Sequence, residues 1–185
     1  MRVIAGKARR LILKSAPGLD TRPTTDRIKE TLFNILNPEL PGASFLDLFA
    51  GSGGIGIEAL SRGARFAVFV DNSPKAIRCI QENLAHTKLA DDALVLQKNA
   101  ISGIRELALR NYRFDLVFMD PPYQSGVEEE TLKALAASGI IDQDTLVIIE
   151  AERHNTLDFI DHTNFEVIRV KDYKTNKHYF LKIRS

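Results

Sequence analysis

Residues 45–56 read Phe-Leu-Asp-Leu-Phe-Ala-Gly-Ser-Gly-Gly-Ile-Gly, and this stretch decides the fold. Its first half is short, apolar and aromatic, which predicts a buried strand over residues 45–49. Its second half is rich in glycine and runs into a predicted helix at residues 54–62. A strand that passes through glycines into a helix offers close backbone approach and free N–H groups to a ligand. The stretch therefore favours a nucleotide-type binding turn, and an ordinary tight turn is the alternative.

Strands and helices alternate downstream of this stretch. Short apolar runs predict further strands at residues 66–70, 93–96, 114–119, 146–149, 165–170 and 178–183. Apolar residues at helical spacing predict helices from residue 24 or 25 to 36, from Pro74 through Leu84, at 101–110 and at 127–138. The alternation predicts an α/β fold, a doubly wound and mostly parallel sheet with helices on both faces. We expect the last two strands to form an antiparallel edge.

The glycine spacing also fits the dinucleotide pattern Gly-x-Gly-x-x-Gly, at Gly51, Gly53 and Gly56. Asp71 lies 20 positions beyond Gly51 at the end of the next strand, where a carboxylate would accept hydrogen bonds from ribose hydroxyls. A dinucleotide and S-adenosylmethionine both contain an adenosine that would use this acid. The residues predicted here to bind such a cofactor are Asp47, Phe49, Gly51, Gly53, Asp71 and Asn72.

A second motif, Asp120-Pro121-Pro122-Tyr123, follows the predicted strand at 114–119. Each proline fixes its φ at about −65° and donates no backbone hydrogen bond, so the loop is stiff and its carbonyls stay free to accept. Asp120 adds a carboxylate acceptor and Tyr123 adds a flat aromatic face. Such a cup suits a planar group with an NH2, such as the amine of a base, and these four are the predicted catalytic residues. An ordinary strand-ending turn is the alternative, since Asp and Pro favour turns.

Both motifs end strands that a doubly wound sheet places side by side, at the edge where ligands bind. A nicotinamide-dependent oxidoreductase has no need of an acid-Pro-Pro-aromatic cup, and 185 residues leave little room for a separate substrate domain. Methyl transfer needs both parts together. We therefore expect Asp120 and the Pro121 carbonyl to accept the amine's N–H groups, with Tyr123 stacked on the base.

The residues at 47–53 (Asp-Leu-Phe-Ala-Gly-Ser-Gly) and at 120–123 resemble the Class I S-adenosylmethionine-dependent methyltransferases that act on exocyclic amines of bases. Residues 2–11 and 22–36 narrow the resemblance to the bacterial 16S ribosomal RNA guanine-N2 methyltransferase family. The resemblance implies a seven-stranded sheet, S-adenosylmethionine as cofactor and methylation of one guanine in 16S rRNA of the small ribosomal subunit. Many wider relatives have an acid where Asn99-Ala100 stands here. The resemblance implies that these two residues, Asn99 and Ala100, complete the cofactor site, with the Asn99 amide bonded to the adenine edge. An adenine-N6 DNA methyltransferase and a non-catalytic RNA-binding protein of the same fold are the alternatives.

Basic charge is concentrated at both ends of the chain. Residues 1–35 carry a net charge of +5, residues 36–160 carry −7 and residues 161–185 carry +3. This asymmetry favours a polyanion such as RNA as partner. The predicted RNA contacts are Arg2, Lys7, Arg9, Arg10, Arg22 and Arg27, together with Lys29.

The N-terminal segment is predicted to be a small unit of its own. Residues 2–4 and 10–13 predict a small hairpin with Gly6 near its turn, and residues 15–23 predict a linker loop. The chain is thus predicted to comprise a basic hairpin and linker, 1–23, and a methyltransferase domain, 24–185. The alternative to RNA binding is that the hairpin merely covers one end of the sheet.

Other features limit the cellular context. A single cysteine, Cys79, rules out an internal disulfide and fits a reducing cytosol. No apolar run approaches the roughly 20 residues that span a bilayer, and the basic start lacks a long apolar region. We expect a cytoplasmic monomer that needs neither metal nor membrane. The residues predicted to be structural or solvated rather than metal ligands are His86, His154, His162, His178 and Glu128 to Glu130.

Overall fold

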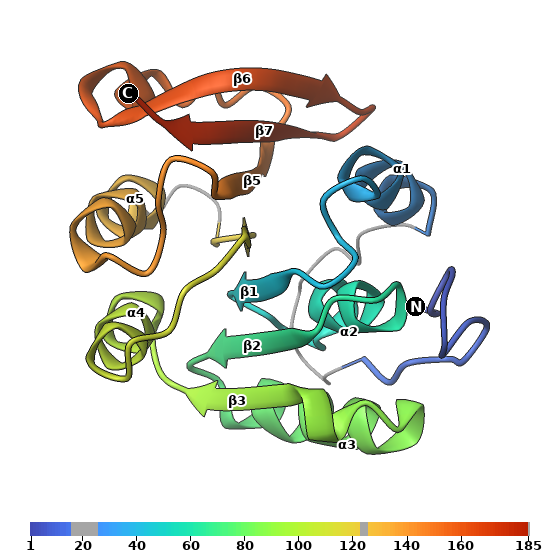
Figure 1. The fold of residues 1–185 in the computed structure, drawn as a ribbon. Helices are drawn as coiled ribbons and strands as arrows, with labels where there is room; N and C mark the ends of the chain where they lie inside the picture. The colour runs from blue at the N-terminus through green and yellow to red at the C-terminus, as the bar shows by residue number, and fades with distance from the viewer. Residues whose placement is uncertain (16–25, 123–125, 185) are drawn as a thin grey trace.

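The computed structural model describes residues 1–15, 26–122 and 126–184, which form a layered α/β fold (Figure 1). The helices are α1 (Asp26–Leu36), α2 (Gly54–Ser61), α3 (Pro74–Thr87), α4 (Ala100–Leu109) and α5 (Val127–Ser138). The strands are β1 (Ser44–Leu48), β2 (Phe66–Asp71), β3 (Ala93–Gln97), β4 (Leu116–Met119), β5 (Leu146–Glu152), β6 (Phe165–Asp172) and β7 (Asn176–Ile183). The predicted start of α1 and the predicted linker, apart from Ser15, lie outside the described residues.

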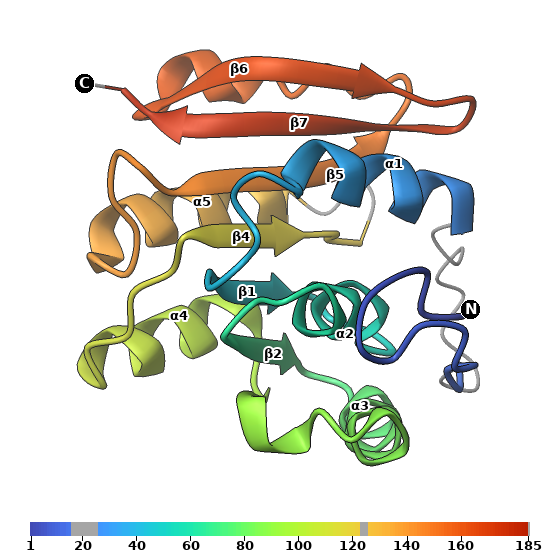
Figure 2. The same ribbon diagram turned by 45° about the vertical axis from the view of Figure 1, so that its right-hand side comes forward.

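All strands join one seven-stranded sheet in the order β3-β2-β1-β4-β5-β7-β6. The five strands from β3 to β5 run parallel, and β7 and β6 complete the sheet in antiparallel pairs, which confirms the predicted edge. The strand order reverses direction between β1 and β4, where Leu48 pairs with Met119. Figure 2 shows that the parallel strands point toward one end of the sheet, so the predicted loops leave it together.

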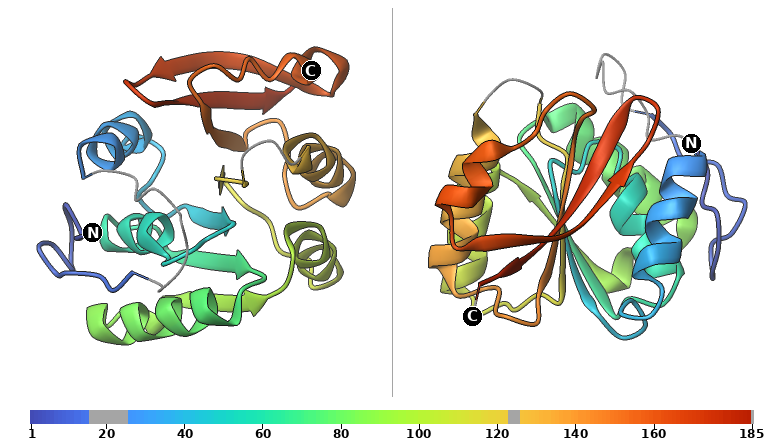
Figure 3. Two further views of the ribbon diagram at one scale, coloured as in Figure 1. Left: turned by 180° about the vertical axis from the view of Figure 1, so that it is seen from behind. Right: turned by 90° about the horizontal axis from the view of Figure 1, so that it is seen from above.

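Helices cover both faces of the sheet (Figures 1 and 3). The layer with α1, α2 and α3 encloses one core, to which β1 and β4 contribute Phe45 and Phe118. The layer with α4 and α5 encloses a second core, which receives Leu46 and Val117 from the same two strands. Because these strands are buried on both faces, β4 is a continuous apolar run, and β1 departs from one only at Ser44 and Asp47.

Helix α1 turns a mixed face toward the core. Lys29, Leu32, Phe33 and Leu36 are buried, whereas Ile28 and Ile35 are half-buried. The Lys29 ammonium is fully buried, 3.2 Å from a carboxylate oxygen of Glu58 on α2, and it donates to the Arg2 carbonyl at 2.5 Å. The prediction that Lys29 contacts RNA is therefore wrong.

The predicted N-terminal hairpin is present only as a shortened pairing. Arg2 and Ile12 form a single antiparallel bridge rather than two strands. The N–H groups of Ile4 and Ala5 donate instead to the Glu58 carboxylate on α2, at 2.8 and 3.0 Å. Three backbone bonds still join the two halves of the hairpin, from the N–H groups of Val3, Arg10 and Leu13 to the carbonyls of Leu11, Val3 and Met1. The bonds to α2 fix the segment to the body of the protein.

The N-terminal segment also contributes to the main core. Val3, Ala8 and Leu13 are buried there, and the Ala8 N–H donates to the Ser61 hydroxyl at 2.9 Å. Gly6 lies so close to α2 that a Cβ would overlap the Ser61 carbonyl. Within the described parts of the chain, no helix combines the length and apolar character needed to cross a membrane.

Candidate active site

The turn between β1 and α2 is built from residues predicted to bind a cofactor. Phe49, Gly51 and Gly53 have positive φ values of 61°, 56° and 78°. A Cβ on Gly56 would lie 2.3 Å from the Phe69 ring on β2, so a glycine there lets α2 lie directly against the sheet. The turn therefore exposes backbone at the N-terminal end of α2, where anions and polar ligands are favoured.

Asp71 ties the end of β2 to this glycine turn. One carboxylate oxygen accepts the Gly51 N–H at 2.9 Å and the other accepts the Ser73 N–H at 2.8 Å. Asp71 is partly exposed, and its neighbour Asn72 is exposed. A carboxylate offers about four lone-pair positions, so Asp71 retains capacity for a ligand hydroxyl. The structure thus brings Gly51 and Asp71 into direct contact.

Asp47 lies beneath the turn. Its side chain is 2% exposed, and one oxygen accepts the Gly56 N–H at 2.9 Å. Burial raises the pKa of the Asp47 carboxyl to about 8, against the smaller opposing effect of the Gly56 N–H, and the nearby charge of Asp71 adds to the rise. Asp47 therefore supports the first turn of α2, and a direct contact with a cofactor stays a prediction.

Asn99 and Ala100 follow β3 at the same edge of the sheet. Asn99 is exposed and caps α4, because its side-chain oxygen accepts the Ser102 N–H at 2.8 Å. Ala100 is the first residue of the helix and is buried. Since the cap uses the amide oxygen, a bond from Asn99 to an adenine would come from its NH2 group.

Asp120 leaves the sheet beside the glycine turn. It follows Met119, whose partner Leu48 ends β1. Burial raises the pKa of Asp120 well above its ordinary value, and the charges of Glu150 and Asp47 raise it further. Pro121 is buried and Pro122 is exposed. Tyr123, the fourth predicted catalytic residue, lies outside the described residues.

A buried polar group beside Asp120 was not predicted. Glu150 on β5 contacts Asn176 and His178 on β7, and His178 contacts Tyr173. The sequence held one signal for it, because Glu150 ends the apolar run 146–149 just as Asp120 ends the run before it. These three residues are distant from Glu150 in sequence, and the antiparallel pairing of β5 with β7 brings the two direct partners, Asn176 and His178, to it.

The predicted RNA contacts are arranged around α1 and the N-terminal segment. Arg2, Lys7, Arg9, Arg10 and Arg27 are exposed, and Arg22 lies outside the described residues. Arg2 also forms a surface ion pair with Asp26, at 2.8 Å. The segment 1–15 therefore presents a basic surface on the side of the molecule that carries α2, and Arg27 on α1 lies next to acids of the same helix (Figure 2).

The described residues hold no cluster of three or more His, Cys, Asp or Glu side chains placed to bind a metal ion. His86, His154 and His162 are exposed, as predicted. The prediction of a solvated helix start at Glu128 to Glu130 is wrong for Glu128, which is 5% exposed at the first turn of α5. Cys79 is buried in the core.

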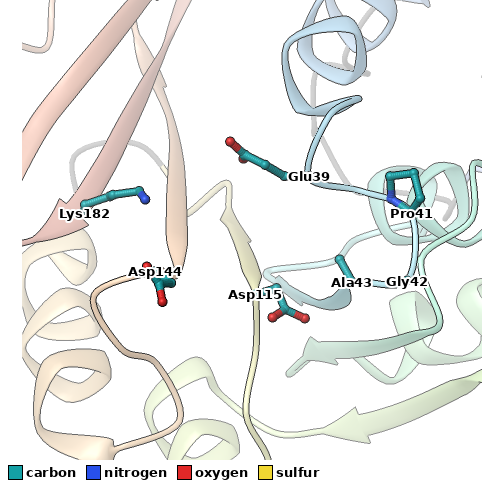
Figure 4. Close-up of a pocket in the computed structure, with 7 residues that line it drawn as sticks. All are labelled: Glu39, Pro41, Gly42, Ala43, Asp115, Asp144 and Lys182. Carbon is teal, nitrogen blue, oxygen red and sulfur yellow. The ribbon is translucent and has the colours of Figure 1, made fainter.

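A pocket of about 360 Å³ lies at the opposite edge of the sheet, where β1, β4 and β5 begin (Figure 4). It is lined by the carboxyl groups of Glu39, Asp115 and Asp144 and by Lys182. Asp115 has a structural role, because it accepts both the N–H and the hydroxyl of Ser44 at 2.7 Å. This pocket is separate from the edge where the two predicted motifs meet.

Comparison with known proteins gives matches along nearly the whole chain. The family described as Conserved hypothetical protein 95 matches residues 1–182. The chain is 41% identical over 159 residues to the Ribosomal RNA small subunit methyltransferase D of Escherichia coli K12, covering 85% of this chain and 77% of that protein. The protein of the same name from Haemophilus influenzae is 34% identical over 160 residues, covering 85% and 81%.

A solved structure extends the match to the fold. A hypothetical protein of Thermus thermophilus superposes with a TM-score of 0.84 at 30% identity, and the alignment covers 99% of both chains. The residues matched by the family include the N-terminal segment, the glycine turn and the Asp120 loop.

Proposed function

Since this chain belongs to the Conserved hypothetical protein 95 family, we propose that it is an S-adenosylmethionine-dependent methyltransferase that modifies the exocyclic N2 of a guanine in 16S rRNA. Its relatives in E. coli and H. influenzae are named Ribosomal RNA small subunit methyltransferase D. One observation carries the proposal: β1 and β4 are paired at Leu48 and Met119, so the glycine turn and Asp120 leave neighbouring strand ends. A cofactor on the first would lie beside an amine on the second.

The residues near the glycine turn fit an adenosyl group. The lone pairs of Asp71 that remain beside its bonds to Gly51 and Ser73 would accept the ribose hydroxyls. The NH2 group of Asn99 would bond to the adenine edge. When bound, S-adenosylmethionine supplies an electrophilic methyl group on a sulfonium, so the reaction depends chiefly on alignment.

Asp120 and the Pro121 carbonyl would hold the acceptor amine. The lone pair of a guanine N2 is delocalised into the ring, and acceptance of its two N–H groups would turn that lone pair out of the ring system. We propose that Tyr123 stacks on the base, a contact worth roughly 1–3 kcal/mol. Such stacking would offset the few kcal/mol needed to extract the base from its helix.

The direct test of this function uses ribosomal RNA from a strain that lacks the protein. Purified protein and S-adenosylmethionine carrying a labelled methyl group are incubated separately with small-subunit particles, with naked 16S rRNA and with DNA. Mass spectrometry of the nucleosides should then show N2-methylguanosine. Label in the adenine of DNA would instead support the DNA methyltransferase, and an unlabelled product with retained RNA binding would support a non-catalytic protein.

Arg9 and Arg10 provide a test of the RNA surface that leaves the fold intact. Both are exposed on the N-terminal segment, whereas deletion of the segment would remove Val3, Ala8 and Leu13 from the core. The double substitution of Arg9 and Arg10 by Ala should weaken RNA binding and flatten the log–log salt dependence by about 0.7–0.9 for each lost phosphate contact. Filter binding across a salt series measures both effects.

Arg110 and Lys133 serve as the matched control for this experiment. They carry the same charge but lie at the end of α4 and on α5, across the sheet from the N-terminal segment. Their double substitution by Ala should leave the salt slope unchanged. Equal slopes for both double variants and the wild type would favour the alternative in which the segment only covers the sheet.

A further inference from the structure

Three acids from adjacent strands converge beside the proposed amine site. Met119 pairs with Ile149, and Asp120 and Glu150 are the next residues along β4 and β5. Asp47 on β1 is opposite Phe118. Because side chains alternate along a strand, these three acids face the layer that contains α1, α2 and α3, as do Phe118 and Ile148.

Both carboxylate oxygens of Glu150 have a hydrogen-bond partner on β7. The Asn176 amide donates to one carboxylate oxygen at 2.6 Å, and Nε2 of His178 lies 3.0 Å from the other. The Tyr173 hydroxyl lies 3.1 Å from Nδ1 of His178. One assignment of protons satisfies both bonds of the His178 ring: the Tyr173 hydroxyl donates to Nδ1, and Nε2–H donates to Glu150.

This group is among the most buried polar sets in the described parts of the protein. The exposed fractions are 5% for Glu150, 4% for Asn176 and 0% for His178. The His178 ring also packs edge-on against Phe118, with centroids 5.9 Å apart. Burial of so many polar groups is costly unless all are hydrogen-bonded, so the bonds fix the Glu150 carboxylate in one position.

We propose that Glu150, fixed by Asn176 and the His178–Tyr173 pair, is a positioning residue whose negative charge enables Asp120 to take the proton released from the methylated amine. The proposal rests on the proposed function. The nitrogen forms a bond to the methyl carbon while the carbon–sulfur bond breaks and its electron pair stays on sulfur. The nitrogen then carries a positive charge and one surplus proton. Transfer of this proton to the Asp120 carboxylate leaves a neutral methylamino group and a neutral carboxyl.

The electrostatic effects on Asp120 act in the direction that the proposal requires, because they make its carboxylate a stronger base. Burial raises the pKa of Asp120, and the charges of Glu150 on β5 and Asp47 on β1 add to the rise. Burial and Glu150 likewise raise the pKa of Tyr173 to about 12, against a smaller opposing effect of Arg169 on β6. A carboxylate with a raised pKa is a stronger base, and a fixed negative charge also stabilises the cationic nitrogen.

The substitution Glu150→Gln tests the proposal because it removes the charge and keeps the size. The Asp120 resonance, assigned by its loss in Asp120→Asn, is titrated by carboxyl carbon NMR in the wild type and the variant. Its midpoint should fall by about one pH unit or more without Glu150. In single-turnover assays at saturating cofactor, the acid limb of the pH–rate profile should move the same way, and the plateau rate should fall about tenfold.

Two further variants separate charge from structure. Glu152→Gln removes the same charge two residues further along β5 and should leave the Asp120 midpoint in place. Tyr173→Phe keeps the Glu150 charge and should lower the plateau rate while the Asp120 midpoint stays raised. An Asp120 midpoint that is the same in the wild type and Glu150→Gln overturns the proposal. The titration needs no substrate, so it decides this point even if the wild type methylates no guanine.

Discussion

Replacement of Asp120 by alanine should lower methyl transfer by roughly a thousandfold while cofactor affinity stays close to that of the wild type. The loss follows from the removal of the carboxylate that would orient the amine. The glycine turn and Asp71, which would bind the cofactor, make their contacts without Asp120. Single-turnover rates with small-subunit particles, and calorimetric titration with S-adenosylmethionine, measure the two quantities separately.

The same variant should also be at least as stable as the wild type. Since burial and the charges of Glu150 and Asp47 raise the pKa of Asp120, ionisation of this carboxyl disfavours the folded state at pH values above its ordinary range. Removal of the carboxyl relieves that cost, so Asp120→Ala should need an equal or higher denaturant concentration to unfold at pH 8. Asp144→Ala, at the opposite edge of the sheet, is the control and should retain full activity. A loss of cofactor affinity as large as the loss of rate would place Asp120 in the cofactor site instead.

The central strands of the sheet could be predicted from sequence because they are buried on both faces. Apolar runs such as residues 146–149 identified these strands, and the alternation with helices fixed the parallel topology. The predicted ends of strands were less accurate where tertiary contacts determine how far a strand extends. Strand β5 extends to Glu152 because Glu150 and Glu152 pair with β7, which the local sequence could not indicate.

Polar residues in the interior were the main failure of the sequence prediction. Lys29 is a charged residue in a basic segment, so the sequence predicted that its side chain would contact solvent or RNA. Its burial depends on Glu58, which lies 29 positions further along the chain and contacts Lys29 where α2 packs against α1. A charge pattern along the chain cannot reveal such a pair, because the partner is defined by packing.

The residues of the candidate site also fall into two groups, those that the local sequence indicated and those that only the structure revealed. Gly51, Asp71 and Asp120 were found because each ends or follows a strand, and the topology then brought them to one edge. Asn176 and His178 reach Glu150, and Tyr173 reaches His178, only through the antiparallel edge of the sheet. Residues that act through a second side chain therefore required the structure.

Asp71→Ala should weaken the binding of S-adenosylmethionine by about 100-fold. Two effects combine in this variant. The ribose hydroxyls lose their acceptor, and the N–H groups of Gly51 and Ser73 lose the carboxylate that fixes the glycine turn to β2. At saturating cofactor the rate should return to within a few-fold of the wild type, in contrast to Asp120→Ala, because the amine site is untouched.

Asp71→Asn distinguishes these two effects, since an amide keeps one acceptor oxygen and so can keep one of the two backbone bonds. Its dissociation constant, measured by calorimetry at fixed ionic strength, should fall between those of the wild type and Asp71→Ala. Asp92→Ala removes an exposed acid just before β3 and should bind the cofactor normally. An unchanged dissociation constant in Asp71→Ala would refute the ribose role. This substitution removes the acceptor and the support of the turn together, so at least the loss of the acceptor would have to weaken binding.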